Sequence, residues 1–100
     1  MTDERFLPVR ALRSAHRRMQ SAYIGREMTR AGLGHARDIH TFTTRAELQA
    51  LFYLSRSTGP NATVVEIGSY LGASTCYLAG GLRPNGGQIV CIDTWENQTM

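Results

Sequence analysis

The fold is decided by the stretch Val64-Val65-Glu66-Ile67-Gly68-Ser69-Tyr70-Leu71-Gly72-Ala73-Ser74-Thr75. Its first residues are mainly β-formers, which predict a short buried strand. Gly68 and Gly72 carry no side chain, so the backbone can turn sharply there or approach a ligand closely. Ser74 and Thr75 occupy positions where helix N-caps are expected. This order predicts a ligand-binding edge of an open α/β sheet, with a plain strand–turn–helix connection as the alternative.

A second strand is predicted at Gln88-Ile89-Val90-Cys91-Ile92-Asp93, which is apolar until its final acid. The first strand, residues 63–67, is likewise apolar except for Glu66, as is typical of parallel strands covered on both faces. The helix between them is expected to end at Gly80-Gly81. One βαβ unit with parallel strands follows, so the two acids share an edge. Asp93 follows Gly72 by 21 residues, close to the roughly 20 expected for an acid that binds an adenosine ribose.

Two helices are predicted upstream. Residues 8 to about 30 form an amphipathic helix that ends near Gly32 and Gly34. Thr44-Arg45-Ala46-Glu47 has the form of a capping box and starts a second helix, which ends before residue 57. The first helix is expected to pack through an apolar stripe of five residues: Leu12, Ala15, Met19, Ala22 and Tyr23. Its arginines then form a solvated face, with a nucleic-acid or anionic-membrane surface as the alternative.

The composition fits one small globular domain of 100 residues with 42% apolar content. Residues 1–60 carry a net charge of +5 and residues 61–100 a net charge of −2. The chain has no apolar run near 18 residues and no signal-like start, so we expect a cytoplasmic protein with no membrane contact. Cys76 and Cys91 are expected to be small buried hydrophobes. His35, Asp38 and His40 fit no strong metal template, so no metal site is predicted.

Tyr70 argues against a dinucleotide, because a pyrophosphate turn needs a small residue or close backbone at that place. The residues resemble the class I S-adenosylmethionine-dependent methyltransferases, in the branch with a Glu-x-Gly-x-x-x-Gly-x-Ser motif that includes O-methyltransferases. The resemblance covers roughly residues 40–100. It implies a Rossmann-like α/β sheet, of which this chain holds only the N-terminal helices and the first βαβ unit.

The resemblance also implies a role for each matching residue. Glu66 would lie beside the methionyl ammonium, and Ser74 would bind the methionyl carboxylate. Tyr70 would pack beside the cofactor, Asp93 would take both ribose hydroxyls, and Trp95 would flank the adenine or belong to the core. The full implied cofactor-binding set is Glu66, Gly68, Ser69, Tyr70, Gly72, Ser74, Asp93, Thr94 and Trp95.

These expectations divide the chain into a basic helix and loop, residues 1–40, and the start of the cofactor-binding domain, residues 41–100. The expected function is methylation of an oxygen on a small molecule, such as a natural product or a sugar. The catalytic residues, and the ligands of any divalent cation such as Mg, would lie beyond residue 100. We expect no nucleic-acid partner and consider self-association through the N-terminal helices. The alternatives are a non-catalytic assembly module and a nucleotide-binding oxidoreductase fragment.

Overall fold

The computed structural model describes the backbone of residues 6–96 and the side chains of residues 9–96. Its elements follow one another as a long helix, a short 3₁₀ turn, a second helix and then one βαβ unit with a 3₁₀ turn before the last strand. In chain order they are α1 (Phe6–Arg30), η1 (Gly34–Asp38), α2 (Arg45–Arg56), β1 (Thr63–Ile67), α3 (Ala73–Leu82), η2 (Arg83–Asn85) and β2 (Gln88–Ile92).

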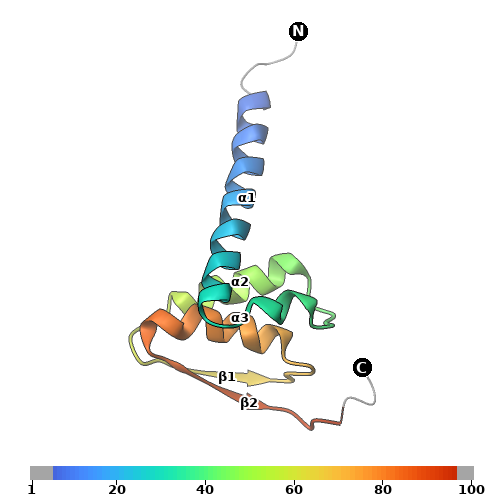
Figure 1. The fold of residues 1–100 in the computed structure, drawn as a ribbon, viewed down its shortest axis with the longest axis vertical. Helices are drawn as coiled ribbons and strands as arrows, with labels where there is room; N and C mark the ends of the chain where they lie inside the picture. The colour runs from blue at the N-terminus through green and yellow to red at the C-terminus, as the bar shows by residue number, and fades with distance from the viewer. Residues whose placement is uncertain (1–5, 97–100) are drawn as a thin grey trace.

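Strands β1 and β2 pair in parallel, with Glu66 opposite Cys91 and Ile67 opposite Ile92. The predicted βαβ unit is therefore confirmed, and both strands end at the same edge. Helices α2 and α3 form a layer on one side of this two-stranded sheet, and α1 rises away from that layer (Figure 1). The two acids of the sequence motif are thus brought to one end of a helix-covered sheet.

The expectation that both faces of the sheet are covered is wrong for the described residues. Side chains alternate between the helix layer and solvent along both strands, as the twofold period of a strand dictates. Because all three helices lie on the same side, the second face stays open and Ile67 is 81% exposed. Four apolar residues form this open face: Val65, Ile67, Val90 and Ile92.

Helix α3 does not end at Gly80-Gly81, as predicted, but continues to Leu82. The two glycines serve the contact with the neighbouring helices. A Cβ at Gly80 would lie 2.3 Å from the sulfur of Met28, and one at Gly81 would lie 2.3 Å from the carbonyl oxygen of Phe52. The missing side chains let the helices approach closely, and the stability gained from this contact outweighs the weak helix propensity of glycine.

The expected packing face of α1 is also wrong. Leu12 and Met19 are exposed, whereas Ile24 and Met28 enter the core beside Ala36. Only the last two turns of the helix face the body of the domain. Of the predicted stripe, Tyr23 packs against Phe52, whereas Leu12, Ala15, Met19 and Ala22 stay exposed among the described residues. The stop signal is confirmed. Gly32 adopts a positive φ of 76°, and the N–H of Leu33 bonds the carbonyl of Met28 in a Schellman motif.

The start of α2 is confirmed in detail. The Thr44 hydroxyl accepts the N–H of Glu47 at 3.2 Å, and the Glu47 carboxylate accepts the N–H of Thr44 at 2.9 Å. These bonds satisfy donors that a helix start leaves free. The residues just before, Gly34–Asp38, form a short 3₁₀ helix rather than an open loop.

Arg56, at the end of α2, joins all three helices. Its guanidinium donates to the carbonyls of Gly80 at 3.2 Å and Gly81 at 2.8 Å on α3. It also donates to Tyr23 at 2.6 Å and Glu27 at 3.1 Å on α1. Burial raises the pKa of Glu27, but the hydrogen bond and the charge of Arg56 outweigh it and hold that pKa below its usual value. The base of α1 is thereby fixed to the layer that carries the site.

Candidate functional site

Glu66 is the first acid of the site, and its side chain points to the helix-covered face of β1. Its carboxylate accepts the hydroxyls of Ser74 and Thr75 from the first turn of α3. The predicted N-cap role of these two residues is wrong, because α3 begins at Ala73 after Gly72, and no side chain of the described residues caps it. The hydroxyls instead stabilise a carboxylate that would otherwise be costly to bury.

The loop between β1 and α3 has the backbone that the glycine spacing predicts. Gly68 has a φ of 82° and Gly72 a φ of 95°, a region that L side chains rarely adopt. A Cβ built at either position would meet nothing within 4 Å. The N–H of Gly68 bonds the carbonyl of Ile92 at 2.8 Å, which ties the loop to the end of β2. The loop is therefore held at the sheet while its glycine positions face open space.

Asp93, the second acid, bridges the two strand ends. Its carboxylate accepts the N–H of Trp95 at 2.9 Å and the N–H of Tyr70 at 2.7 Å. These two backbone hydrogen bonds hold the pKa of Asp93 below its usual value, so it is ionised near neutral pH. Asp93 thus fixes the loop between β1 and α3 through the N–H of Tyr70. Glu66 fixes the helix that follows this loop through Ser74 and Thr75.

Tyr70 lies in an aromatic group that the motif alone does not reveal. Its ring centroid lies 5.8 Å from that of Phe42 and 6.1 Å from that of His40. The loop before α2 is thereby placed against the glycine loop, although about 30 residues separate them in the sequence. Tyr70 has a φ of 52°, and a large residue in this region carries backbone strain that surrounding contacts must offset. The spacing of the sequence motif points to neither Phe42 nor His40, because only the folded chain brings their segment against Tyr70.

The remaining predicted site residues differ in exposure. Ser69 is buried, and its hydroxyl is the one buried side-chain polar atom of the described residues without a hydrogen-bond partner. Thr94 and Trp95 are exposed, with Trp95 at 57% and a φ of 60°. A large exposed aromatic and a buried, unpaired hydroxyl at the same edge of the sheet are unusual for a purely structural turn.

Seven of the nine predicted residues are thus gathered around the loop: Glu66, Gly68, Ser69, Tyr70, Gly72, Ser74 and Asp93. Cys76, on α3 beside this group, is half-buried, and burial followed by the charge of Glu66 raises the pKa of its thiol. Within residues 6–96 no three His, Cys, Asp or Glu side chains are grouped to hold a metal ion. None of the described helices combines the length and the apolar character that a membrane span requires.

Residues 65–100 match a protein family described as a methyltransferase domain. The match spans about a third of the chain and contains both acids, the glycine loop, α3 and β2. No curated protein and no solved structure matched the chain. Taken with the two acids at adjacent strand ends, the family match supports an S-adenosylmethionine-dependent methyltransferase domain of class I, with the described β1–α3–β2 unit as part of its α/β sheet.

Proposed function

We propose that this protein transfers a methyl group from S-adenosylmethionine to an oxygen of a small molecule, such as a natural product or a sugar. The observation that carries the proposal is the pair of acids, Glu66 and Asp93, on either side of the Gly68–Gly72 loop. A carboxylate at each of two neighbouring strand ends suits a ligand with a cationic amine at one end and vicinal hydroxyls farther along.

The residues fit this cofactor on three grounds. Space is open above Gly68 and Gly72, where a Cβ would touch nothing. The Ser69 hydroxyl has no protein partner, so a polar group or a bound water can complete its hydrogen bonding. Asp93 is held in its ionised form by backbone N–H groups, as an acceptor for ribose hydroxyls requires.

Within the proposal, each residue has one task. Glu66 holds the methionyl ammonium, and the hydroxyls of Ser74 and Thr75 keep its carboxylate oriented. Asp93 accepts the two ribose hydroxyls, and Tyr70 packs beside the cofactor. Thr94 and Trp95 extend the site towards the adenine. Ser74, which donates to Glu66, retains lone pairs and lies beside the free N–H groups of the first turn of α3, which favour the methionyl carboxylate.

The cofactor supplies an activated methyl group on a sulfonium centre. As the acceptor oxygen bonds to the methyl carbon, the carbon–sulfur bond breaks, its electron pair stays on sulfur, and the acceptor proton passes to a base. The residues described above contribute by positioning and orientation. On this proposal, the base and the ligands of any assisting divalent cation come from residues other than those named above. Loss of turnover in EDTA, with recovery on adding Mg²⁺, tests the cation.

A non-catalytic assembly module is the second candidate. The observation that favours it is α1, whose residues 9–19 are largely exposed and include arginines and apolar residues that contribute nothing to the proposed cofactor site. The two functions differ in one measurable property. An assembly module needs no cofactor, whereas a methyltransferase must bind both S-adenosylmethionine and its demethylated product.

Isothermal titration of the full-length protein with S-adenosylhomocysteine tests the proposal. Saturable one-to-one binding is expected, and Glu66→Gln should weaken it because the ammonium loses its charged partner. A complete lack of binding would reject the methyltransferase function and leave the assembly module. Transfer of a labelled methyl group to hydroxyl acceptors, compared with amine and thiol acceptors of the same shape, then tests the choice of oxygen.

A further inference from the structure

Helix α1 changes its apolar face halfway along its length. Met28 is buried against the body of the domain, whereas Met19 is 67% exposed. The nine residue steps from Met19 to Met28 advance the helix by about 900°, which is two full turns and about half a turn more. The exposed apolar side chains of the first turns therefore point away from the body, and no rotation of α1 could bury both sets in the same core.

Three exposed apolar residues of α1 and one histidine follow a heptad spacing. Val9, Leu12, His16 and Met19 are separated by three, four and three residues, and Tyr23 continues the pattern four residues later. Tyr23 donates a hydrogen bond to Glu27 and packs against Phe52. The heptad pattern therefore reaches the body of the domain at Tyr23. Alternating steps of three and four residues give a period of 3.5, which keeps one stripe facing a partner helix. We call Val9, Leu12, His16 and Met19 the α1 seam.

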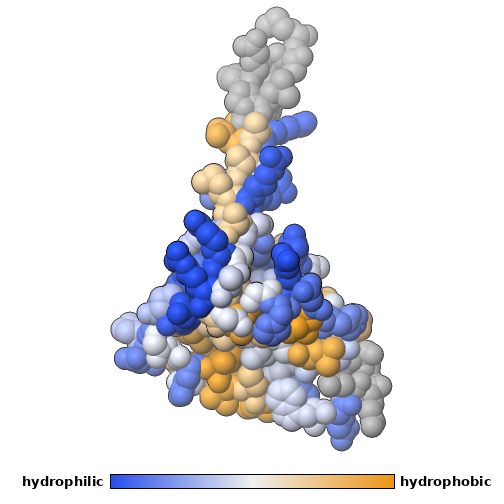
Figure 2. Space-filling view, viewed as in Figure 1, coloured by the Kyte–Doolittle hydropathy of each residue, from blue (hydrophilic) through white to orange (hydrophobic). Residues whose placement is uncertain are grey.

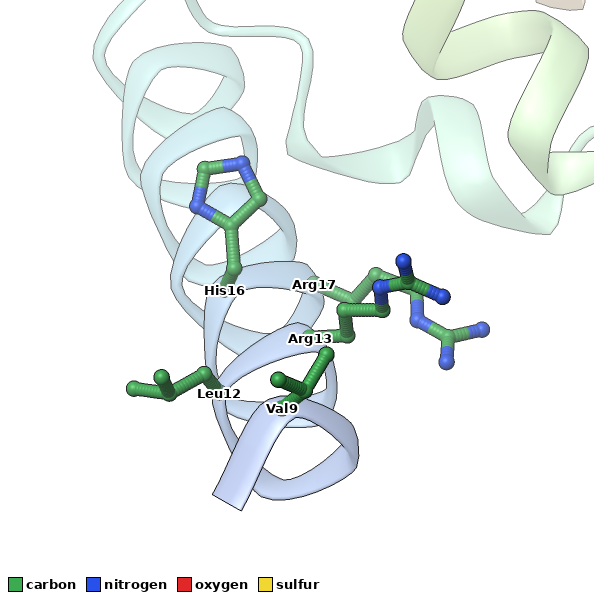
Figure 3. Close-up of a pocket in the computed structure, with 5 residues that line it drawn as sticks. All are labelled: Val9, Leu12, Arg13, His16 and Arg17. Atoms are coloured by element: carbon green, nitrogen blue, oxygen red, sulfur yellow. The ribbon is translucent and has the colours of Figure 1, made fainter. Parts of the chain in front are cut away.

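The arginines of this region lie off the seam. Figure 3 shows Arg13 and Arg17 extending together on one side of the helix, with Leu12 on the other side. Figure 2 shows the same separation, with hydrophobic colouring along one flank of the projecting helix and hydrophilic colouring along the other. If Val9 and His16 take heptad position a, then Arg10 and Arg17 take position b and Arg18 takes position c, all outside the contact. Arg13 takes position e, at the edge of the contact.

We propose that the α1 seam pairs with the seam of a second copy of this chain, as a short parallel two-stranded coiled coil. A β-branched residue at position a and leucine at position d favour parallel dimers, as Val9 and Leu12 provide. His16 is then the single polar residue at position a, a feature that fixes register at some cost in stability. The proposal concerns assembly and does not depend on the methyltransferase function.

Charge decides the direction of the pair. In a parallel pair, position g of one helix faces position e of the other, so that Ala15 lies opposite Gln20 and no like charges meet. In an antiparallel pair centred on the same seam, position e of each helix faces position e of the other, and the two Arg13 side chains would approach each other. Like-charge pairs of this kind are unfavourable.

The position of the body agrees with the parallel direction. Ile24 and Met28, which face the body, take heptad positions b and f on the side of α1 opposite the seam, and only Tyr23 at the end of the pattern also contacts the body. The bodies of two copies therefore lie mainly on the outer sides of the pair. Residues 9–23 span about 22 Å of helix about 10 Å wide, so the contact covers only a few hundred Å² per copy. A standard interface covers about 800 Å² per partner. The dimer is therefore expected to be weak and dependent on concentration.

Sedimentation velocity of the full-length protein over a hundredfold concentration range tests the pairing. The wild type should shift from monomer to dimer, and Leu12→Glu should weaken the dimer on the order of a hundredfold, because a charge enters the seam. His16→Leu should strengthen it about tenfold or more, because position a becomes apolar. Arg10→Glu, one step outside the seam, is the matched control and should leave the dimer fraction unchanged.

Direction is tested by disulfide formation. Leu12→Cys should give a covalent dimer on mild oxidation, because position d meets position d in a parallel pair, while Arg10→Cys should not. Circular dichroism of each variant checks that α1 remains helical. A chain that stays monomeric throughout would overturn the proposal, as would a dimer that Leu12→Glu and His16→Leu leave unchanged. Binding of the wild type to phosphatidylglycerol vesicles, abolished by Leu12→Glu without any dimer, would assign the seam to a membrane surface instead.

Discussion

Replacement of Gly81 by alanine should destabilise the protein, although alanine is the better helix former. An added Cβ would lie 2.0 Å from the Ser55 hydroxyl oxygen, 2.3 Å from the carbonyl oxygen of Phe52 and 3.2 Å from the N–H of Arg56. Two of these three atoms belong to the backbone of α2 and cannot rotate away. The helices α2 and α3 must therefore move apart, and the 2.8 Å bond from Arg56 to the Gly81 carbonyl is lengthened with them.

The size of the effect follows from two opposing contributions. Helix propensity favours alanine over glycine by about 1 kcal/mol. Overpacking a tight contact costs about 1–3 kcal/mol, and the charge-assisted hydrogen bond contributes on the order of 1.5–3 kcal/mol more when lost. The expected net loss is about 2 kcal/mol, which corresponds to a fall in the melting temperature of roughly 10 °C for a domain of this size.

Urea unfolding followed by circular dichroism measures this loss, with two other glycines as controls. Gly80→Ala should be milder, because its new Cβ meets the sulfur of Met28, at the far end of an adaptable side chain. Gly25 lies on an exposed part of α1, and a Cβ there would meet nothing within 4 Å. Gly25→Ala should therefore raise the free energy of unfolding by up to about 1 kcal/mol. A Gly81→Ala protein as stable as Gly25→Ala would refute the close approach of α2 and α3.

Three further outcomes are expected. Thr44→Ala should lower the free energy of unfolding by about 1 kcal/mol, since it removes the cap on Glu47, and chemical denaturation measures it; no change would contradict the capping box. Arg56→Lys should destabilise the protein in thermal melts, because one ammonium cannot reach acceptors on both α1 and α3; full stability would contradict its joining role. Finally, the pKa values of Asp93 and Glu27 are lowered in the folded chain. As the pH falls below about 4, the unfolded chain therefore binds more protons than the folded chain, and the free energy of unfolding should decrease. Urea titrations from pH 7 to pH 3 measure this loss, and a flat profile would argue against both sets of hydrogen bonds.

The sequence predicted the elements whose signals are local. The capping box at Thr44, the Schellman glycine at Gly32 and the two parallel strands are each specified by neighbouring residues. Errors arose where tertiary contacts overrode such signals. Gly80 and Gly81 look like a helix end in sequence but lie within a close helix contact, and Ser74 and Thr75 look like caps but bond Glu66 instead.

The candidate site shows the same division. The grouping of Glu66, Gly68, Gly72 and Asp93 could be predicted, because strand ends and turns fix their spacing and the two strands pair in parallel. His40 could not be found, because only the folded chain brings the segment before α2 against Tyr70. Most of the apolar stripe predicted for α1 stays exposed, because hydrophobic periodicity does not say what a stripe packs against.

Titration of Asp93→Asn with S-adenosylhomocysteine tests whether Asp93 belongs to an S-adenosylmethionine site. Asparagine keeps the size of the side chain but lacks the charge that ribose hydroxyls favour, so affinity should fall by at least tenfold, in line with about 1.5–3 kcal/mol per charge-assisted bond. Glu96→Gln, an exposed acid three residues later, is the control and should bind like the wild type. Equal affinity in Asp93→Asn and the wild type would contradict the assignment of this carboxylate to the cofactor.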